Sequence, residues 1–284
     1  MPIDSTDEYR LTKERARARL DHALTGNAEV LRRINENHSG WALNLYREAG
    51  EASGSFRASH RSSPGGSLVL NPDELTQEQI RSAKERSREE AGRRARRQIC
   101  RYCAHNRLNR LGTLTFATGC HDRYHLRLLL ADFFKQLRKE IGRDLPYVWV
   151  PEWHSTDHGL HAHFAVGRYI KKTVIEAAWP DGFVHIKLLG DLPHGSLDLD
   201  QSRVAAGHLS KYVSKGFFDD RHIDGLHRYD IAQGFTPKPT KLFAPKLEDV
   251  LRVAVDRMGS PFNYIWHSND NPDWARPAAV HLSW

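Results

Sequence analysis

The order of strand-like and helix-like segments between residues 111 and 217 limits how this chain can fold more than any other sequence feature. Residues 111–118, 147–153, 160–166 and 182–189 have the β-branched, aromatic and alternating composition of strands. Residues 123–141, 171–179 and 200–216 place apolar side chains at helical spacing. The polar turn STDHG at 155–159 indicates a β-hairpin. The order β-α-β-β-α-β-α predicts an α+β fold rather than a doubly wound parallel sheet.

The segments on either side of this core have a different character. Residues 8–33 form a short amphipathic run, and residues 50–67 are rich in Ser and Gly, which predicts loop or disorder. A long charged helix is predicted to begin at Pro72, with Asn71 as its N-cap. After Phe217 the chain is irregular, except for a helix predicted over 246–258. The predicted division is a partly disordered or helical segment (1–70), a basic helix (71–110), the core domain (111–220) and a C-terminal extension (221–284).

The net charge of +7 is concentrated in one stretch of the chain. Residues 81–110 contain 11 Lys and Arg against three Asp and Glu, so the remainder is nearly neutral. A charged helix is usually a solvated face, but this density favours contact with phosphate groups. We therefore expect Arg93, Arg94, Arg96, Arg97 and Arg101 to contact the phosphate groups of a polyanion such as DNA.

Several classes of protein are disfavoured by what the sequence lacks. No apolar run approaches the roughly 18 to 20 residues of a spanning helix, and the first residues, MPIDSTDEY, do not resemble a secretory signal. Three cysteines are too few for a disulfide scaffold, so we expect a cytoplasmic protein with no membrane partner. Cys100 and Cys103 form a CxxC that Cys120, His121 or His125 would have to complete as a zinc site, and no second CxxC exists. The sequence has no phosphate-binding loop typical of ATP-driven motors.

His161 and His163 are the strongest candidates for metal ligands. Residues two apart on a strand face the same way with Cα atoms about 6.5 Å apart, so both rings can reach one cation. Such pairs are often merely structural, but two imidazoles buried without partners would cost free energy. Glu152 on the neighbouring predicted strand supplies a carboxylate, and His154 or His158 are alternatives to it. Two histidines and a carboxylate suit a catalytic divalent ion with open coordination positions.

Lys211, Tyr212 and Lys215 lie together on a predicted helix. A tyrosine in such a position usually packs in the core, with the lysines solvated. Here the phenol stands between two ammonium groups that would stabilise a phenolate and hold phosphate oxygens. Combined with a metal ion, such a tyrosine can cleave a phosphodiester by forming a covalent intermediate.

Three blocks in this order resemble the three motifs of the HUH endonucleases: TLTFAT (113–118), PEWHSTDHGLHAHFAV (151–166) and KYVSKG (211–216). They are most similar to the replication initiators (Rep) that start rolling-circle replication of bacterial plasmids and related mobile elements. The resemblance covers residues 111–217 and implies a ferredoxin-like five-stranded antiparallel sheet with flanking helices, His161 and His163 being metal ligands on a central strand. It implies Glu152 as third ligand, Tyr212 as the single nucleophile, and Lys215 as a group that positions the metal or stabilises charge.

The resulting hypothesis is a site-specific nickase of single-stranded or extruded origin DNA that uses Mn²⁺ or Mg²⁺. The product would be a 5′-phosphotyrosine and a 3′-hydroxyl that DNA polymerase extends, while a host helicase unwinds the duplex. A mobilisation relaxase or transposase of the same superfamily is the first alternative. A non-catalytic DNA-binding copy-control protein is the second, and a zinc hydrolase built on His161, His163 and Glu152 is the third.

Overall fold

The computed structural model describes residues 39–58, 76–156, 158–188, 196–217, 219, 221, 226–274 and 276–284. The chain divides into two compact units. Residues 1–45, 52–69 and 241–284 belong to the first, and residues 46–51 and 70–240 to the second. The amphipathic run at 8–33 lies outside the described residues. None of the described helices is long and apolar enough to cross a membrane.

The second unit is built on a five-stranded sheet with β5 at its centre. Its strands follow the order β6-β3-β5-β4-β7, and each neighbouring pair is antiparallel. They are β3 (Arg110–Phe116), β4 (Tyr147–Trp153), β5 (Leu160–Val166), β6 (Gly182–Leu188) and β7 (Asp230–Ile231). The predicted α+β class is therefore confirmed, and the short β7 is a strand that the sequence did not reveal.

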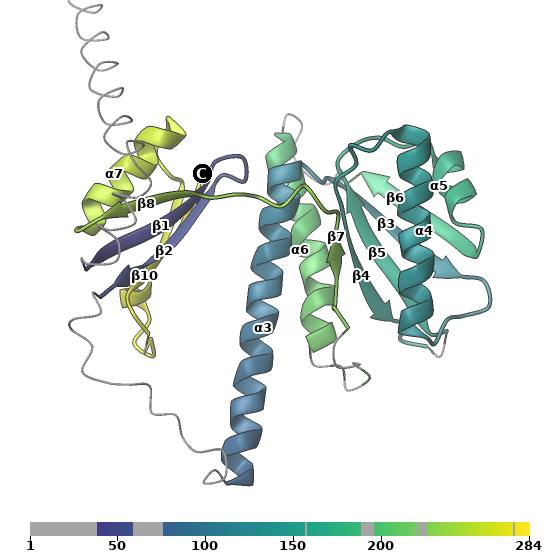
Figure 1. Cartoon of the computed structure of the whole chain (residues 1–284), viewed down its shortest axis with the longest axis horizontal. Helices are drawn as coiled ribbons and strands as arrows, with labels where there is room; N and C mark the ends of the chain where they lie inside the picture. Colours follow the sequence, from purple (N-terminus) through teal and green to yellow (C-terminus); the bar gives the residue numbers. More distant parts are fainter. Residues whose placement is uncertain are drawn as a thin grey trace, which may run out of the picture. The chain divides into compact units, whose positions relative to one another are not determined.

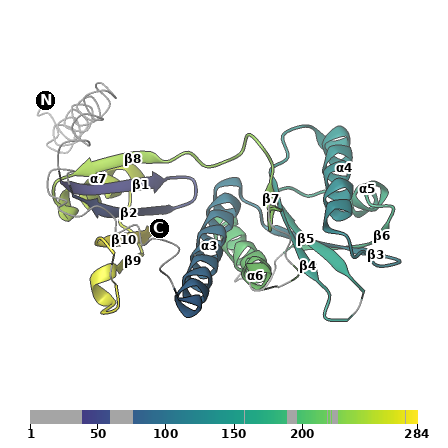
Figure 2. The ribbon, with the colours of Figure 1, turned by 60° about the horizontal axis from the view of Figure 1, so that its bottom comes forward.

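Two pairs of helices cover the two faces of this sheet, as Figure 1 shows. On one face are α4 (Arg123–Ile141) and α5 (Lys172–Ala178), and on the other α3 (Gln77–Asn106) and α6 (Asp198–Phe217). In both views α3 and α6 lie side by side (Figures 1 and 2). The order β3-α4-β4-β5-α5-β6 is the ferredoxin-like arrangement that the resemblance implies.

The central strand β5 has one apolar face and one polar face. Phe164 packs with α4, and its ring lies over Gly112 of β3, where a Cβ atom would overlap the ring. His161 and His163 alternate with these residues, so they point to the opposite face, where α3 and α6 lie. The residues of the apolar face are all buried: Leu160, Ala162, Phe164 and Val166. Strand alternation therefore aims both imidazoles at one side of the sheet.

The start of α3 differs from the sequence prediction. The helix begins at Gln77, and the N-cap is Thr76, whose backbone is extended. The backbone N–H of Gln79 donates to Thr76 Oγ1 (3.2 Å), and that of Thr76 donates to Gln79 Oε1 (2.9 Å). This reciprocal capping box satisfies two backbone N–H groups at the helix start, so Thr76 takes the N-cap role expected of Asn71, which lies outside the described residues. The prediction of a helix start at Pro72 is thus wrong.

The first unit forms a second five-stranded sheet, in the order β8-β1-β2-β10-β9. Its elements are β1 (Gly40–Tyr46), β2 (Glu51–Arg57), β8 (Thr240–Ala244), α7 (Leu247–Met258), β9 (Tyr264–His267), the 3₁₀ turn η3 (Ser268–Asp270) and β10 (Ala279–Ser283). The helix predicted at 246–258 is confirmed, and β8, β9 and β10 were not predicted. The domain boundaries read from the sequence stay a prediction. This sheet combines β1 and β2 from residues 1–70 with β8, β9 and β10 from residues 221–284, whereas β7 of the latter range belongs to the other sheet.

The prediction of a loop at residues 50–67 is wrong for Glu51–Arg57, which form strand β2. Ala52 is buried in the core of the first unit. Gly54 lies so close to the backbone at Ala42 and Leu43 that no Cβ atom fits there. Small residues that look like a linker in the sequence therefore allow close approach between strands, and neighbouring strands on both sides stabilise the segment.

Candidate active site

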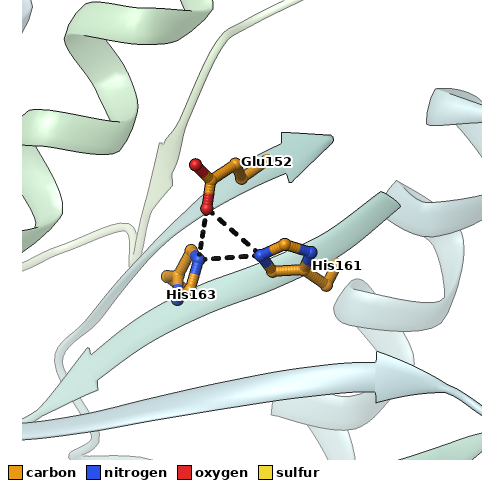
Figure 3. Close-up of side chains that lie close together, drawn as sticks. All are labelled: Glu152, His161 and His163. Carbon is orange, nitrogen blue, oxygen red and sulfur yellow. Dashed lines mark hydrogen bonds and ion pairs between the residues drawn. The ribbon is translucent and has the colours of Figure 1, made fainter. Parts of the chain in front are cut away.

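The register of the β4–β5 hairpin brings three candidate metal ligands together. Glu152 is directly opposite His161 across the antiparallel ladder, and His163 lies two residues further along the same face. The backbone N–H of His154 donates to the carbonyl of Gly159 (2.8 Å) at the turn, which fixes this register. Figure 3 shows the carboxylate of Glu152 and both rings converging from adjacent strands.

The ligand atoms form a nearly equilateral triangle. Glu152 Oε2 lies 3.2 Å from His161 Nε2 and 2.9 Å from His163 Nε2. The two Nε2 atoms are 3.0 Å apart. The side chains of His161, His163 and Glu152 are only 11%, 13% and 17% exposed, so water competes weakly for these atoms. Three lone-pair donors at this spacing in a shielded position are the arrangement expected around a cation.

The triangle fits a divalent cation by its dimensions and its chemistry. Cis ligands at about 2.1 Å from an octahedral ion are about 3.0 Å apart. A tetrahedral site with the same bond lengths would separate them by about 3.4 Å. Among the described residues, Glu152, His161 and His163 are the one group of three acidic, His or Cys side chains close enough to hold a metal ion. Three protein ligands would leave positions open for a substrate.

The charges around the triangle favour the protonation states that metal binding needs. Burial would raise the pKa of Glu152, but hydrogen bonds from His161, His163 and Lys215 outweigh it and hold the pKa well below its usual range. Burial lowers the pKa of His163, which favours the neutral ring. An ionised carboxylate and a neutral imidazole are the forms that bind a metal.

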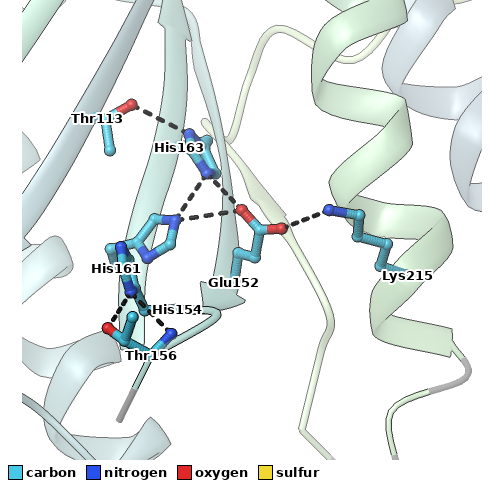
Figure 4. A network of polar contacts seen from close by, with 7 residues as sticks. All are labelled: Thr113, Glu152, His154, Thr156, His161, His163 and Lys215. Atoms are coloured by element: carbon cyan, nitrogen blue, oxygen red, sulfur yellow. Dashed lines mark hydrogen bonds and ion pairs between the residues drawn. The ribbon is translucent and has the colours of Figure 1, made fainter. Parts of the chain in front are cut away.

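Thr113 supports His163 from the other neighbouring strand. The two residues are directly opposite across the β3–β5 ladder, and Thr113 Oγ1 lies 3.1 Å from His163 Nδ1 (Figure 4). Partners of this kind fix the orientation of a ligand ring. His161 Nδ1 is buried and has no partner among the described protein atoms. Sequence reasoning missed Thr113, because a threonine in a strand becomes informative only once β3 is placed beside β5.

Tyr212 and Lys215 of α6 both reach the triangle. The Tyr212 ring is stacked on His163, with centroids 3.8 Å apart and planes 7° from parallel. Figure 4 shows Lys215 Nζ donating to Glu152 Oε1 (2.9 Å). The same Nζ lies 5.6 Å from the centre of the Tyr212 ring. Lys211 is exposed, and no contact links it to this group among the described residues. Its catalytic role stays a prediction.

The other histidines and the cysteines do not join the cluster. His154 Nδ1 accepts from the backbone N–H of Thr156 (3.1 Å), and His158 is exposed. Neither belongs to the candidate metal-binding group of Glu152, His161 and His163, so Glu152 rather than these alternatives is the third member. Cys100 and Cys103 lie on α3, and no cysteine is part of any such group among the described residues. The structure therefore gives no support to a zinc site at the CxxC.

A cleft of about 690 Å³ opens beside the triangle and contains Tyr212 and Lys215. Its wall includes Arg123, which is only 6% exposed, and Arg221, whose guanidinium carbon lies 4.5 Å from the centre of the Trp153 ring. Arg123 Nε and Trp153 Nε1 are buried without a partner among the described residues. Arg221 is already ion-paired with Asp219, so it is the buried donors of Arg123 and Trp153 that suit an anionic ligand. Sequence reasoning missed them, because Arg123 reads as an ordinary first-turn residue.

The arginines expected to bind DNA differ in their surroundings. Arg93, Arg94, Arg96 and Arg97 are exposed on α3. Arg101 is instead hydrogen-bonded to Glu51, and its guanidinium lies 3.7 Å from the centre of the Tyr46 ring, within the same unit. The DNA-binding role of all five stays a prediction, but Arg101 already has an acidic partner.

Comparison with known protein families places part of the chain in a described family model. Residues 109–217 match the model of the family described as Replication-associated protein ORF2/G2P. The match begins just before β3 and ends with α6, so it includes the metal-binding group, Thr113 and Tyr212. It supports a Rep-like, replication-associated protein. No curated protein and no solved structure matches the chain significantly.

Proposed function

We propose that this protein is a site-specific single-strand DNA endonuclease and ligase that initiates rolling-circle replication through a covalent 5′-phosphotyrosine. The observation that carries the proposal is the stacking of Tyr212 on His163 at 3.8 Å, which places a phenol beside a metal-binding group. The match of residues 109–217 to a replication-associated family agrees with it.

The residues of the cleft divide the task between them. His161, His163 and Glu152 would hold Mn²⁺ or Mg²⁺, which when bound supplies Lewis acidity at a scissile phosphate. Lys215 orients Glu152 through Oε1 and adds positive charge near the Tyr212 ring. Stacking on His163 limits rotation of the phenol, so that it is already oriented for attack.

The reaction is a transesterification. Tyr212 Oη forms a bond to phosphorus, and the bond from phosphorus to the 3′-oxygen breaks. The phenol loses its proton, and the departing 3′-oxygen gains one. The phosphodiester is exchanged rather than hydrolysed, so the same site can rejoin the strand when a 3′-hydroxyl attacks the phosphotyrosine.

The substrate and partners follow from this chemistry. A base-paired strand is shielded in the duplex, so the substrate is single-stranded or extruded origin DNA, held by the cations and Trp153 of the cleft. The free 3′-hydroxyl primes a host DNA polymerase, and a host helicase separates the strands in the cytoplasm. A mobilisation relaxase or a transposase would use the same residues on a different recognition sequence.

An adduct assay tests the proposal. The protein is incubated with Mn²⁺ and a pool of random-sequence, single-stranded oligonucleotides labelled at the 3′ end, because the 3′ fragment keeps the phosphate that Tyr212 attacks. The wild type should give labelled DNA that migrates with the protein on a denaturing gel and is released by protease. Tyr212→Phe should give none, whereas Tyr169→Phe, which alters an exposed tyrosine of the same unit, should match the wild type.

Each competing function predicts a different gel. An adduct with Tyr212→Phe would reject Tyr212 as the nucleophile. Cleaved DNA without an adduct, unchanged by Tyr212→Phe, would indicate a metal-dependent hydrolase. Intact DNA without an adduct, together with a shifted band on a native gel, would indicate a copy-control protein.

A further inference from the structure

A second, larger hollow of about 990 Å³ lies at the other end of β4, around Tyr147. Four cations line it, three from the last turns of α4 and one from the residue after the helix cap: Lys135, Arg138, Lys139 and Arg143. No acidic side chain is among its lining residues. We call the space that these four cations line the cationic hollow. It shares no residue with the cleft beside the metal-binding group.

The sequence places these cations together at a cost to the helix. Lys135 and Lys139 are four residues apart on α4, and like charges at that spacing are destabilising by roughly 0.2–0.5 kcal/mol. The dipole of α4 favours cations in its last turn, which explains Arg138 and Lys139 but not Lys135, one turn earlier. None of the four cations is paired with an acidic side chain among the described residues.

Arg138 is held in place by aromatic rings instead of by an acid. Its guanidinium carbon lies 5.0 Å from the centre of the Tyr147 ring, and Tyr147 is stacked on Phe134 with centroids 3.5 Å apart and planes 6° from parallel. Arg138 Nε is buried with no partner among the described residues. A buried donor without a partner costs free energy, which an anion in the hollow would recover.

The chemistry of the hollow selects its ligand class. Beside the apolar surface of Ala131, Tyr147 and Phe235, the hollow presents four cations and the amides of Gln136 and Gln233. Lys, Arg and Gln side chains are common donors to phosphate oxygens of nucleic acids. The carboxyl end of α4 carries a partial charge of about −0.5, which four positive charges exceed. A phosphodiester backbone therefore fits better than a neutral ligand.

We propose that the cationic hollow binds the phosphodiester backbone of DNA at a distance from the scissile phosphate. Its assignment to DNA rests on the proposed function. From Tyr147 to Glu152 is five residues along β4, about 17 Å. The two side chains point to opposite faces of the sheet, because Tyr147 is opposite Val166 and Glu152 is opposite His161, so the DNA path between them is longer than five nucleotides of a duplex strand at about 3.4 Å each. The hollow would then hold the segment flanking the nick while the cleft holds the nick itself.

The test measures how DNA binding depends on salt. Fluorescence anisotropy is recorded with a 20-nucleotide mixed-sequence strand and with the corresponding duplex, from 50 to 200 mM KCl and with EDTA to prevent cleavage. In the variant, Lys135, Arg138, Lys139 and Arg143 are replaced by Gln. Each phosphate contact contributes roughly 0.7–0.9 to the slope of log K against log salt, so the slope should become shallower by about 3. The probe with the larger change shows whether single strand or duplex is held.

A matched control separates the hollow from net charge. Arg168, Lys171, Lys172 and Lys187 are exposed cations of the same unit, and replacing all four by Gln changes the charge equally. This control should change the slope by less than 1. An equal change in both variants would overturn the proposal, as would an unchanged slope in the hollow variant. Equal weakening of binding to polyglutamate would do so too, since it would indicate a general polyanion surface.

A smaller variant guards against misfolding. Arg138 packs on Tyr147, but Lys135, Lys139 and Arg143 are exposed, so their triple replacement by Gln should unfold at the wild-type temperature and still make the slope shallower by about 2. Because EDTA is present, the result does not depend on Tyr212. A shallower slope together with no adduct from the wild type would keep the hollow and reject the endonuclease.

Discussion

The two ends of β4 present opposite kinds of site. At Glu152, charges of both signs are paired at short range: a carboxylate contacts two imidazoles, and its second oxygen accepts from Lys215 at 2.9 Å. At Tyr147, four cations line a hollow without an acidic side chain. Paired charges define the position of one atom, whereas a uniform charge attracts a polyanion without fixing where along it the contact falls. The Glu152 end of β4 can thus fix the position of a single atom, whereas the Tyr147 end can attract a polyanion without fixing its register.

Removing a ligand from the Glu152 end should have the largest effect. His161→Ala opens one side of the triangle, and we expect Mn²⁺ to bind at least 100-fold more weakly, since loss of an outer-shell partner alone costs about 10- to 100-fold. Isothermal titration calorimetry measures the affinity. His158→Ala alters an exposed histidine outside the group and should bind Mn²⁺ like the wild type.

The same measurement has a defined pH dependence. Burial lowers the pKa of His163 from 6.5, so the ring stays neutral above that value and protons compete with the metal only at lower pH. Wild-type affinity should therefore be constant above about pH 6.5 and decline below it. The salt slope for DNA in EDTA should be unaffected by His161→Ala. A large change in that slope would show that the two ends of β4 do not act separately.

Loss of the support from β3 should have a smaller effect at the same end. Thr113→Val keeps the shape of the side chain but removes the contact with His163 Nδ1, and we expect Mn²⁺ affinity to fall by about 10-fold. Thr115→Val is the matched control on β3, because Thr115 Oγ1 donates only to the carbonyl of Phe183 (3.3 Å). Equal affinities of the two variants in calorimetry would exclude a role for Thr113 in orienting His163.

The sequence predicted the elements around the metal-binding group because their signals are local. The alternation of His161 and His163 with apolar residues defines β5, and the spacing of apolar residues defines α4 at the bounds the structure has. The convergence of Glu152 on the same point followed from a hairpin whose turn is short. The pair of histidines thus needed only its own strand and the next one to be interpreted.

The remaining features depend on contacts between distant segments. β7 has two residues, and pairing with β4 rather than composition makes it a strand. The composition of β2 is that of a linker, and pairing with β1 and β10 on either side makes it a strand. The cationic hollow was missed for the same reason, since Lys135 and Arg143 look like solvated charges until Tyr147 and Gln233 close the space beside them. Local sequence patterns therefore predicted the candidate metal ligands better than they predicted the features formed by distant segments.

The basic run on α3 should contribute less to DNA binding than the cationic hollow does. Arg93 lies 3.7 Å from Glu89 on the exposed helix, and Arg101 is bonded to Glu51, so part of this charge is already neutralised. Replacing Arg93, Arg94, Arg96 and Arg97 by Gln should make the salt slope shallower by about 1 to 2 and weaken binding only a few-fold, against about 3 for the cationic hollow. Anisotropy under the same conditions measures both. A larger change in the salt slope from the α3 variant than from the hollow variant would contradict this. It would mean that the DNA backbone is bound along α3, the basic surface that the sequence predicts.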